Sequence, residues 1–345
     1  MLKRLLSRGW LIILLSVTLL GCDRATTRPQ LSLAGSLYVG WMPWYLAAED
    51  GTLAKYAQKN QLDIEFIRGD YIETINQFAA GGVDAVVLTN VDALALLANA
   101  GVATDVILIG SYSAGNDAVF MRPTATPELA GKTLGLVEYS VSHYLLERCM
   151  QQQQQPLDAV RRLNIADSEI AAAFAAPGTE LDGVVTWNPI SRQIEQRFGG
   201  KKVCDSRQIE HEIADMLVVK RDTLNQHPGF AQALLHTWFD ITGRLAGPQA
   251  KATRQRLGEL SGTDGAAYQA QLADTELLAQ PEAALRALQD PQMQQTMKRV
   301  QRFVQRHQLV PNAGPATSVS YQRPKAAIHM NAQPLQHYVQ QQTRP

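Results

Sequence analysis

The sequence predicts an α/β protein built from two lobes. Its 345 residues are enough for two hydrophobic cores. Short apolar runs alternate with helical stretches over the first two thirds of the chain, a rhythm typical of parallel strands joined by crossover helices. This rhythm occurs twice, over residues 36–115 and 116–216, and a mainly helical region follows. We therefore expect the chain to cross twice between two α/β lobes that enclose a cleft.

The first lobe is expected to comprise residues 36–115 and, after the chain returns, 217–345. Pro43 cannot donate a ladder hydrogen bond, so the first strand should end before it. The predicted strands of this lobe are residues 36–40, 63–68, 85–88, 106–110, 216–219 and 326–330. Its predicted helices are residues 44–59, 72–80, 93–100, 230–246, 254–261, 291–306 and 335–342.

The second lobe is expected to comprise residues 116–216. Its predicted strands are residues 118–122, 133–137, 160–165 and 183–187. Its predicted helices are residues 142–153, 167–175 and 189–198. A run of glutamines at 151–155 should end the first of these helices at the surface.

The first 21 residues have the proportions of a secretory signal peptide. Lys3, Arg4 and Arg8 precede an apolar run over 10–20 that is too short to span a bilayer. The ending Leu19-Leu20-Gly21-Cys22 resembles a bacterial lipobox, which implies cleavage before Cys22 and acylation of its thiol. Asp23, directly after the cysteine, implies that the lipoprotein is retained at the periplasmic side of the inner membrane. Residues 22–35 are expected to form a polar tether. A plain transmembrane anchor is the alternative.

Charge and motif content exclude several classes of function. Without residues 1–21 the chain has 29 Lys and Arg against 32 Asp and Glu, a net charge of −3 with no basic stripe, so nucleic acid is not an expected partner. The sequence contains no nucleophile elbow, phosphate-binding glycine loop or His-Glu-x-x-His motif, so we expect no catalytic residue, cofactor or metal. Cys149 and Cys204 could pair after export, but their spacing is not diagnostic.

Polar and aromatic residues follow the predicted strands, where ligands bind in open α/β sheets. The candidate ligand-binding residues are Trp41, Trp44, Tyr45, Asp70, Tyr71, Thr89, Asn90, Asp92, Asn116, Asp117, Glu138, Ser140, Ser142, His143, Trp187 and Asn188. Glu210, Glu212 and Asp215 also precede a predicted strand, the returning one, but are not among the candidates. Aromatic faces beside carboxylates suit a small cation or a planar molecule rich in N–H donors. A phosphate, sulfonate or nitrate site should instead show Arg, Lys and free helix N-termini.

Several candidates also have a purely structural interpretation. Asp70, Asp92 and Ser142 could each cap a helix. Trp44 and Trp187 could belong to the core, and His143 could be a hydrogen-bonded structural imidazole. A cap or a core residue can still contact a ligand, so these alternatives stay open.

Six segments carry a family resemblance: VGWMPWYLAAEDG, GDYIETINQFAAG, LTNVDAL, GNDAV, LVEYSVSHYLLER and VVTWNP. Over about residues 37–309 the chain resembles the periplasmic solute-binding lipoproteins of ABC transporters that are related to the nitrate, sulfonate and taurine binders. It is most similar to the group encoded beside urea carboxylase, many of whose enzymes are regarded as guanidine carboxylases. The resemblance implies a type II periplasmic-binding-protein fold with a two-strand hinge. It also implies that the protein is a monomer that delivers its ligand to a membrane permease.

The candidate residues favour guanidinium as the ligand, with urea next. Guanidinium has only N–H donors and a delocalised charge, so it needs carboxylates around its edge. Urea also has a carbonyl oxygen, which needs a donor such as Asn90. We expect Glu138 and Asp92 to bind the edge of the ligand while Trp44 and Trp187 face it. The alternatives are an oxyanion binder, a sensor lipoprotein without a permease, and an enzyme on the same fold related to pyrimidine synthases.

Overall fold

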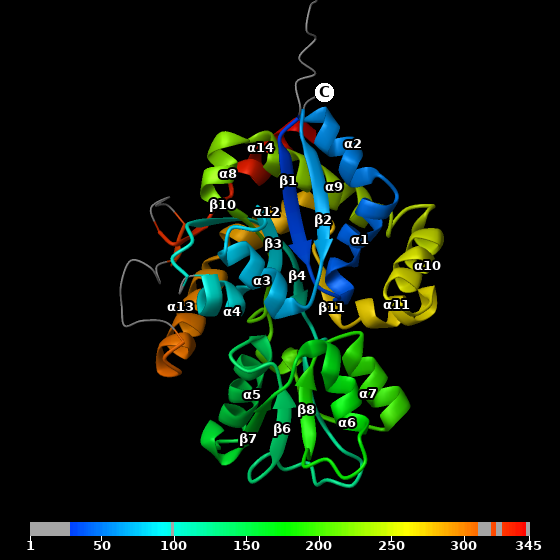
Figure 1. Ribbon diagram of the computed structural model, residues 1–345, viewed down its shortest axis with the longest axis vertical. Helices are drawn as coiled ribbons and strands as arrows, with labels where there is room; N and C mark the ends of the chain where they lie inside the picture. The colour runs from blue at the N-terminus through cyan, green and yellow to red at the C-terminus, as the bar shows by residue number, and fades with distance from the viewer. Residues whose placement is uncertain (1–27, 98–99, 310–318, 322–325, 343–345) are drawn as a thin grey trace, which may run out of the picture.

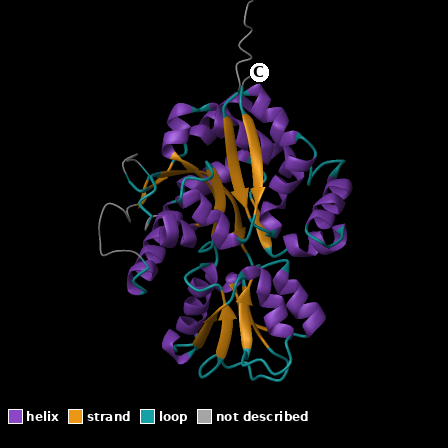
Figure 2. Ribbon diagram, viewed as in Figure 1, coloured by secondary structure: helices purple, strands orange, loops and turns teal. Residues whose placement is uncertain are grey.

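The computed structural model describes residues 28–97, 100–309, 319–321 and 326–342. The expected signal peptide, the expected lipidation site Cys22 and the first part of the tether lie outside these residues. Figure 1 shows two lobes stacked along the long axis of the molecule, with the first strand and the last helix both in the larger lobe. Figure 2 shows that each lobe has strands at its centre and helices around them.

The larger lobe contains, among the described residues, a sheet of eight strands in the order β12-β13-β4-β10-β3-β1-β2, with β11 paired to β4. The bounds are β1 Gln30–Gly35, β2 Asp63–Arg68, β3 Ala85–Thr89, β4 Thr104–Ser113, β10 Ala214–Lys220, β11 Thr275–Leu277, β12 Val319–Ser320 and β13 Ile328–Met330. Strands β2, β1 and β3 are parallel, whereas β10 runs antiparallel to both β3 and β4. Every residue of β3 and β4 is buried, as expected for central strands covered on both faces.

Helices cover this sheet, either directly or by packing on other helices. They are α1 Met42–Glu49, α2 Thr52–Lys59, α3 Tyr71–Ala79, α4 Asn90–Asp92, α8 Arg221–Gln226, α9 Gly229–Gly243, α10 Ala250–Leu260, α11 Gly265–Leu272, α12 Pro281–Gln289, α13 Pro291–Arg306 and α14 Gln333–Gln342. Among the described helices, none is both long and apolar enough to cross a membrane.

The smaller lobe has, within the described chain, a five-stranded sheet in the order β7-β6-β8-β5-β9. Its strands are β5 Ala118–Met121, β6 Thr133–Leu136, β7 Arg161–Asn164, β8 Gly183–Thr186 and β9 Lys201–Asp205, and its helices are α5 Val141–Gln152, α6 Ile170–Ala175 and α7 Ile190–Phe198. Two segments connect it to the larger lobe, residues 114–117 between β4 and β5 and residues 206–213 between β9 and β10.

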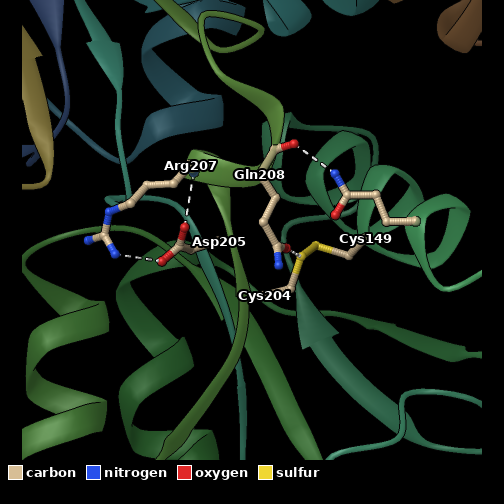
Figure 3. The surroundings of a disulfide bond; sticks show 6 residues. Cys149, Cys204, Asp205, Arg207 and Gln208 are labelled. Carbon is tan, nitrogen blue, oxygen red and sulfur yellow. Dashed lines mark hydrogen bonds and ion pairs between the residues drawn. A yellow bond between two sulfur atoms is a disulfide. The ribbon is translucent and has the colours of Figure 1, made fainter.

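A disulfide joins Cys149 of α5 to Cys204 of β9 within the smaller lobe, with a Cα–Cα distance of 6.2 Å (Figure 3). The pairing that the sequence left open is therefore present in the structure. Cys204 lies one residue before Asp205, the last residue of β9, whose side chain pairs with Arg207. The disulfide thus fixes the strand from which the second connecting segment leaves.

Three expected elements are corrected by the structure. The strand predicted at 36–40 is wrong: the first strand is β1, formed by the last six residues of the predicted tether. Its alternating Leu31 and Leu33 are buried, and the chain then leaves the sheet into a 3-10 turn at Val39–Trp41. The helix predicted at 44–59 is divided into α1 and α2 at Gly51, which has a left-handed φ of 81°. Residues 93–97 form a π-helical turn, and 98–99 lie outside the described residues.

Candidate functional site

A small cavity lies between the two lobes. Its lining residues are Tyr38, Trp41, Tyr71, Thr89, Asn116, Asp117, Val141, Trp187 and Asp215. The space open to the centre of a water molecule is about 10 Å³. A sphere of that volume has a radius of roughly 1.3 Å, so with a water radius of about 1.4 Å added the cavity admits a molecule of only a few heavy atoms.

The lining residues come from strand ends and helix starts of both lobes. In the larger lobe, Tyr38 and Trp41 follow β1, Tyr71 begins α3, Thr89 ends β3 and Asp215 lies near the start of β10. In the smaller lobe, the first connecting segment contributes Asn116 and Asp117, α5 begins with Val141, and Trp187 follows β8. The carboxyl ends of parallel strands are where open α/β sheets bind ligands.

Four aromatic rings form a continuous row along the cavity and across the lobe boundary. The centroids of Tyr38 and Trp41 are 4.8 Å apart in an edge-to-face arrangement, and those of Trp41 and Tyr71 are 5.7 Å apart and stacked. Tyr71 then meets Trp187 of the smaller lobe edge-to-face at 5.4 Å. The row holds the indole rings of Trp41 and Trp187 in place by packing before any ligand enters.

Asp215 is a buried carboxylate of the cavity wall, with 4% of its surface exposed. Its Oδ2 accepts hydrogen bonds from Tyr38 Oη at 2.8 Å and Ser111 Oγ at 2.6 Å. Burial raises the pKa of Asp215 to about 7, and the charge of Asp117 contributes to the increase. Both bonds go to one oxygen, so Oδ1 is the atom left to meet a ligand.

Asp117 is the second buried carboxylate of the wall, also 4% exposed. Asn116 Nδ2 donates to its Oδ2 at 3.1 Å, while Asn116 Oδ1 accepts from the backbone N–H of Asn188 at 3.1 Å. Burial raises the pKa of Asp117 to about 6, although hydrogen bonds from Ser113 and Asn116 oppose the increase. Asn188 therefore supports the site through Asn116.

Asp92 lies immediately behind the wall and is fully buried. Its Oδ2 accepts from Tyr71 Oη at 2.6 Å and Thr89 Oγ1 at 2.7 Å, and its buried Oδ1 has no hydrogen-bond partner among the described residues. Burial raises the pKa of Asp92 to about 6, while the backbone N–H of Val141, at the start of α5, favours the charged form.

These carboxylates have no positive neighbour in the cavity. Among the described residues, no Lys, Arg or His lines it. The charge of Asp117 raises the pKa of both Asp92 and Asp215, so Asp117 repels each of the other two carboxylates. The site is thus built to accept positive charge.

Part of the predicted set lines the cavity or supports it. The predicted residues in the lining are Trp41, Tyr71, Thr89, Asn116, Asp117 and Trp187. Asp92 and Asn188 bond to lining residues. Sequence reasoning missed Tyr38, which lay in the wrongly placed strand. It also missed Val141 and Asp215, although Asp215 stood beside the predicted returning strand.

Two aromatic candidates belong to the core of the larger lobe. Trp44 is 1% exposed and packs against Trp238 of α9, with ring centroids 5.4 Å apart. Tyr45 packs edge-to-face against Phe66 of β2 at 5.0 Å. The turn at Val39–Trp41 aims only Trp41 at the cavity, and α1 directs the other two rings into the core.

The polar candidates outside the lining have structural partners. Glu138, expected at the edge of the ligand, is half-buried, and its Oε1 lies 3.5 Å from Arg162 Nε. Asn90 Oδ1 accepts from the Ala214 N–H at 3.0 Å, which ties the start of α4 to β10, and Ser140 caps α5. The exposed Asp70 accepts a 3.3 Å hydrogen bond from Ser168 across the lobe boundary.

His143 and Ser142 sit on the first turn of α5, and neither lines the cavity. His143 Nδ1 accepts from the Tyr139 N–H at 3.3 Å, and burial lowers its pKa to about 3, so the imidazole is neutral. The backbone N–H of Ser142 donates to Ser140 Oγ at 3.1 Å, so Ser140, not Ser142, is the helix cap.

The chain matches a family model and several solved structures. The model of the NMT1-like family matches residues 28–261, and the chain therefore belongs to that family. The alkanesulfonate-binding protein SsuA from Xanthomonas axonopodis pv. citri, bound to MOPS, has a TM-score of 0.68 and 16% identity, over 82% of this chain and 94% of that one. The aliphatic sulphonate-binding SsuA from Escherichia coli has a TM-score of 0.64 and 16% identity, with the same coverage.

The periplasmic nitrate-binding protein NrtA from Synechocystis PCC 6803 is also similar, with a TM-score of 0.57 and 9% identity over 83% of this chain and 92% of that one. No curated protein sequence matches this chain. These similarities show that the chain has the two-lobe α/β fold of periplasmic binding proteins, as the sequence predicted. At such identities they show the fold alone.

Proposed function

We propose that this member of the NMT1-like family is the substrate-binding component of an ABC importer and that it captures a small planar cation, guanidinium first among the candidates. The observation that carries the proposal is the cluster of buried carboxylates, Asp92, Asp117 and Asp215, at a cavity whose lining has no cationic side chain among the described residues.

Charge is the first argument for a cation. Burying a carboxylate without a positive partner is unfavourable, and the raised pKa values of all three groups express that cost. A cationic ligand offsets the cost, whereas a nitrate or sulfonate adds to the repulsion. The oxyanion alternative is disfavoured because, among the described residues, the lining has no Arg or Lys to balance the charge of its oxygens and offers only the neutral indole N–H groups of Trp41 and Trp187 beside the carboxylates.

Hydrogen-bonding capacity is the second argument, and it favours guanidinium over urea. The side-chain donors of Tyr38, Tyr71, Thr89 and Asn116 are already directed at carboxylates. Apart from the indole N–H groups of Trp41 and Trp187, the polar side chains of the lining thus offer acceptors, which suits a ligand that has only N–H donors. Urea needs in addition a donor for its carbonyl oxygen, and these four groups cannot supply one without leaving a buried carboxylate oxygen unpaired, which leaves the indole N–H groups of Trp41 and Trp187 as the side-chain donors for urea.

The rings and the size of the cavity agree with a flat ligand. Trp41 and Trp187 both line it, and the faces of indole rings attract a cation within about 6 Å. Guanidinium has four heavy atoms, and at a ceiling of about 1.5 kcal/mol per atom the binding free energy is roughly 6 kcal/mol, a Kd on the order of tens of micromolar. Desolvated charge pairs can raise the affinity further.

The cellular setting follows from the same proposal. The protein acts in the periplasm without catalysing a reaction, as a monomer tethered through Cys22, and passes its ligand to a permease in the inner membrane. Titration calorimetry of the chain from Asp23 onward, with guanidinium chloride, urea, taurine and nitrate at one ionic strength, tests the ligand. We expect saturable heat at micromolar concentrations from guanidinium alone. Binding of nitrate or taurine without guanidinium would overturn the proposal.

A further inference from the structure

Helix α13 bridges the two lobes beside the cavity. It packs against α4 and the Ala93–Leu97 turn of the larger lobe, while its C-terminal end lies against α5 of the smaller lobe. In Figure 1 it descends from the larger lobe, in orange, to the level of α5. Helix α5 begins at Val141 in the cavity wall, so one helix both lines the cavity and receives the end of α13.

The apolar part of this contact is centred on Phe303. Its ring is 1% exposed and meets the rings of His143 and Tyr144 edge-to-face, with centroids 5.4 and 5.2 Å away. Phe303 belongs to a helix of the larger lobe, yet α5 of the smaller lobe covers it. Separating the lobes at this point would expose the ring to water.

The polar part of the contact is centred on Glu147 of α5, whose side chain is 6% exposed. Its Oε1 accepts from Gln151 Nε2 at 2.9 Å and pairs with Arg306, and its Oε2 contacts His307 Nε2. A nearly buried carboxylate of the smaller lobe thus takes two of its partners from the end of α13.

A second ion-pair cluster joins α13 to the segment that connects the lobes. Glu212 lies in the segment between β9 and β10. Its Oε1 is 2.7 Å from Nη1 of Arg299 on α13, and its Oε2 is 2.9 Å from Nε of Arg148 on α5. The same Oε2 accepts a hydrogen bond from Tyr144 Oη at 2.5 Å. Arg299 therefore holds α13 to the second connecting segment, and Phe303 and Arg306 hold it to the smaller lobe.

We propose that the C-terminal part of α13, residues 299–307, is a strap that holds the lobes closed over the cavity, with Glu147 and Phe303 as positioning residues that set the ligand affinity without touching the ligand. The cavity takes its wall from both lobes, so a ligand enters and leaves when they separate. Separation breaks the contacts of Glu147 and Phe303, while the connecting segments persist. The strap lowers the open population and so slows ligand release, a role that rests on the proposed function for its ligand.

The test compares Glu147→Gln with Glu180→Gln, which breaks the exposed 2.7 Å pair with Arg161 inside the smaller lobe. Stopped-flow tryptophan fluorescence reports guanidinium release because Trp41 and Trp187 line the cavity. We expect Glu147→Gln to release guanidinium roughly tenfold faster than the wild type with an association rate changed less than about threefold. Glu180→Gln should behave as the wild type. Equal release rates in all three proteins would overturn the strap.

A second measurement needs no ligand. Small-angle scattering of the ligand-free chain should give a larger radius of gyration for Glu147→Gln and for Phe303→Leu than for the wild type and Glu180→Gln. Equal radii would overturn the strap. If the wild type binds no guanidinium, the proposed ligand fails, whereas the scattering comparison still decides the strap.

Discussion

Replacing Asp117 by Asn should weaken cation binding and at the same time stabilise the ligand-free protein. Asp117 is buried in the cavity wall, where Asn116 is its neutral hydrogen-bond partner. Asn has nearly the same shape and keeps one acceptor oxygen, so the change removes charge with little effect on packing.

The magnitudes of the two effects follow from the surroundings of Asp117. A hydrogen bond to a charged group contributes about 1.5–3 kcal/mol, so the Kd for guanidinium should rise roughly 10- to 150-fold. Burial raises the pKa of Asp117 from its ordinary value to about 6, so the folded chain binds this proton more tightly than the unfolded chain. Stability is therefore highest below the unfolded pKa of about 4 and decreases as the pH rises towards 6. Above pH 7 the charged form costs about 3 kcal/mol, which Asp117→Asn relieves.

Calorimetry with guanidinium and denaturant unfolding at pH 7.5 measure the two effects on the same protein. The matched control is Glu138→Gln, because Glu138 lies outside the cavity beside Arg162. We expect the control to bind guanidinium as the wild type does. A variant Asp117→Asn that is less stable than the wild type and binds guanidinium equally well would refute the electrostatic reasoning.

The remaining predictions concern pH, the aromatic rings and the disulfide. Guanidinium affinity should fall as the pH decreases from 8 to 5, because the pKa values of the three carboxylates lie at about 6 to 7 and protonation removes the charge that attracts the cation; calorimetry that gives a constant Kd would contradict this. Trp187→Leu should weaken binding by about 0.5–2 kcal/mol, whereas Trp44→Phe should lower the free energy of unfolding by about 0.5–3 kcal/mol with an unchanged Kd. Replacing Cys149 and Cys204 by Ser should lower the free energy of unfolding by about 2–5 kcal/mol, measured with denaturant, and leave the Kd within about twofold, because the disulfide lies outside the lining.

The order of strands and helices could be predicted because periodicity is a local property of the sequence. The strand at Asp63–Arg68 and the helix at Pro291–Arg306 have the predicted bounds. The first strand was misplaced because the polar residues before and within it resemble a tether, although the alternation of Leu31 and Leu33 is itself a local strand signal. Strand β9 was missed because its sequence, KKVCD, carries two lysines and is stabilised by pairing with β5 at the sheet edge.

The acidic character of the site could be predicted from loop composition, but the direction of each side chain could not. Glu138 follows a predicted strand and Asp117 precedes one. The sequence does not indicate which of the two carboxylates faces the cavity. The structure separates them because Arg162 of the neighbouring strand β7 lies beside Glu138, whereas Asp117 lies in the segment that connects the lobes. Asp215 reaches the cavity because β10 returns antiparallel between β3 and β4, a topology that no local pattern encodes.

The proposed function means that one fold serves ligands of opposite charge, because loops rather than strands supply the binding groups. The backbone framework that this chain shares with sulfonate and nitrate binders places strand ends and helix starts around a cleft. Two features oppose an anion here. Asp92 of α4 lies close to the first turn of α5, where the backbone N–H of Val141 favours its charged form, so an internal carboxylate already takes the position that an anionic ligand could occupy there. The hydroxyl donors of Tyr38 and Tyr71 already bond to carboxylates. An oxyanion that used these hydroxyl donors would have to displace the internal anions from them, whereas the proposed cation would bind the oxygens that they leave free.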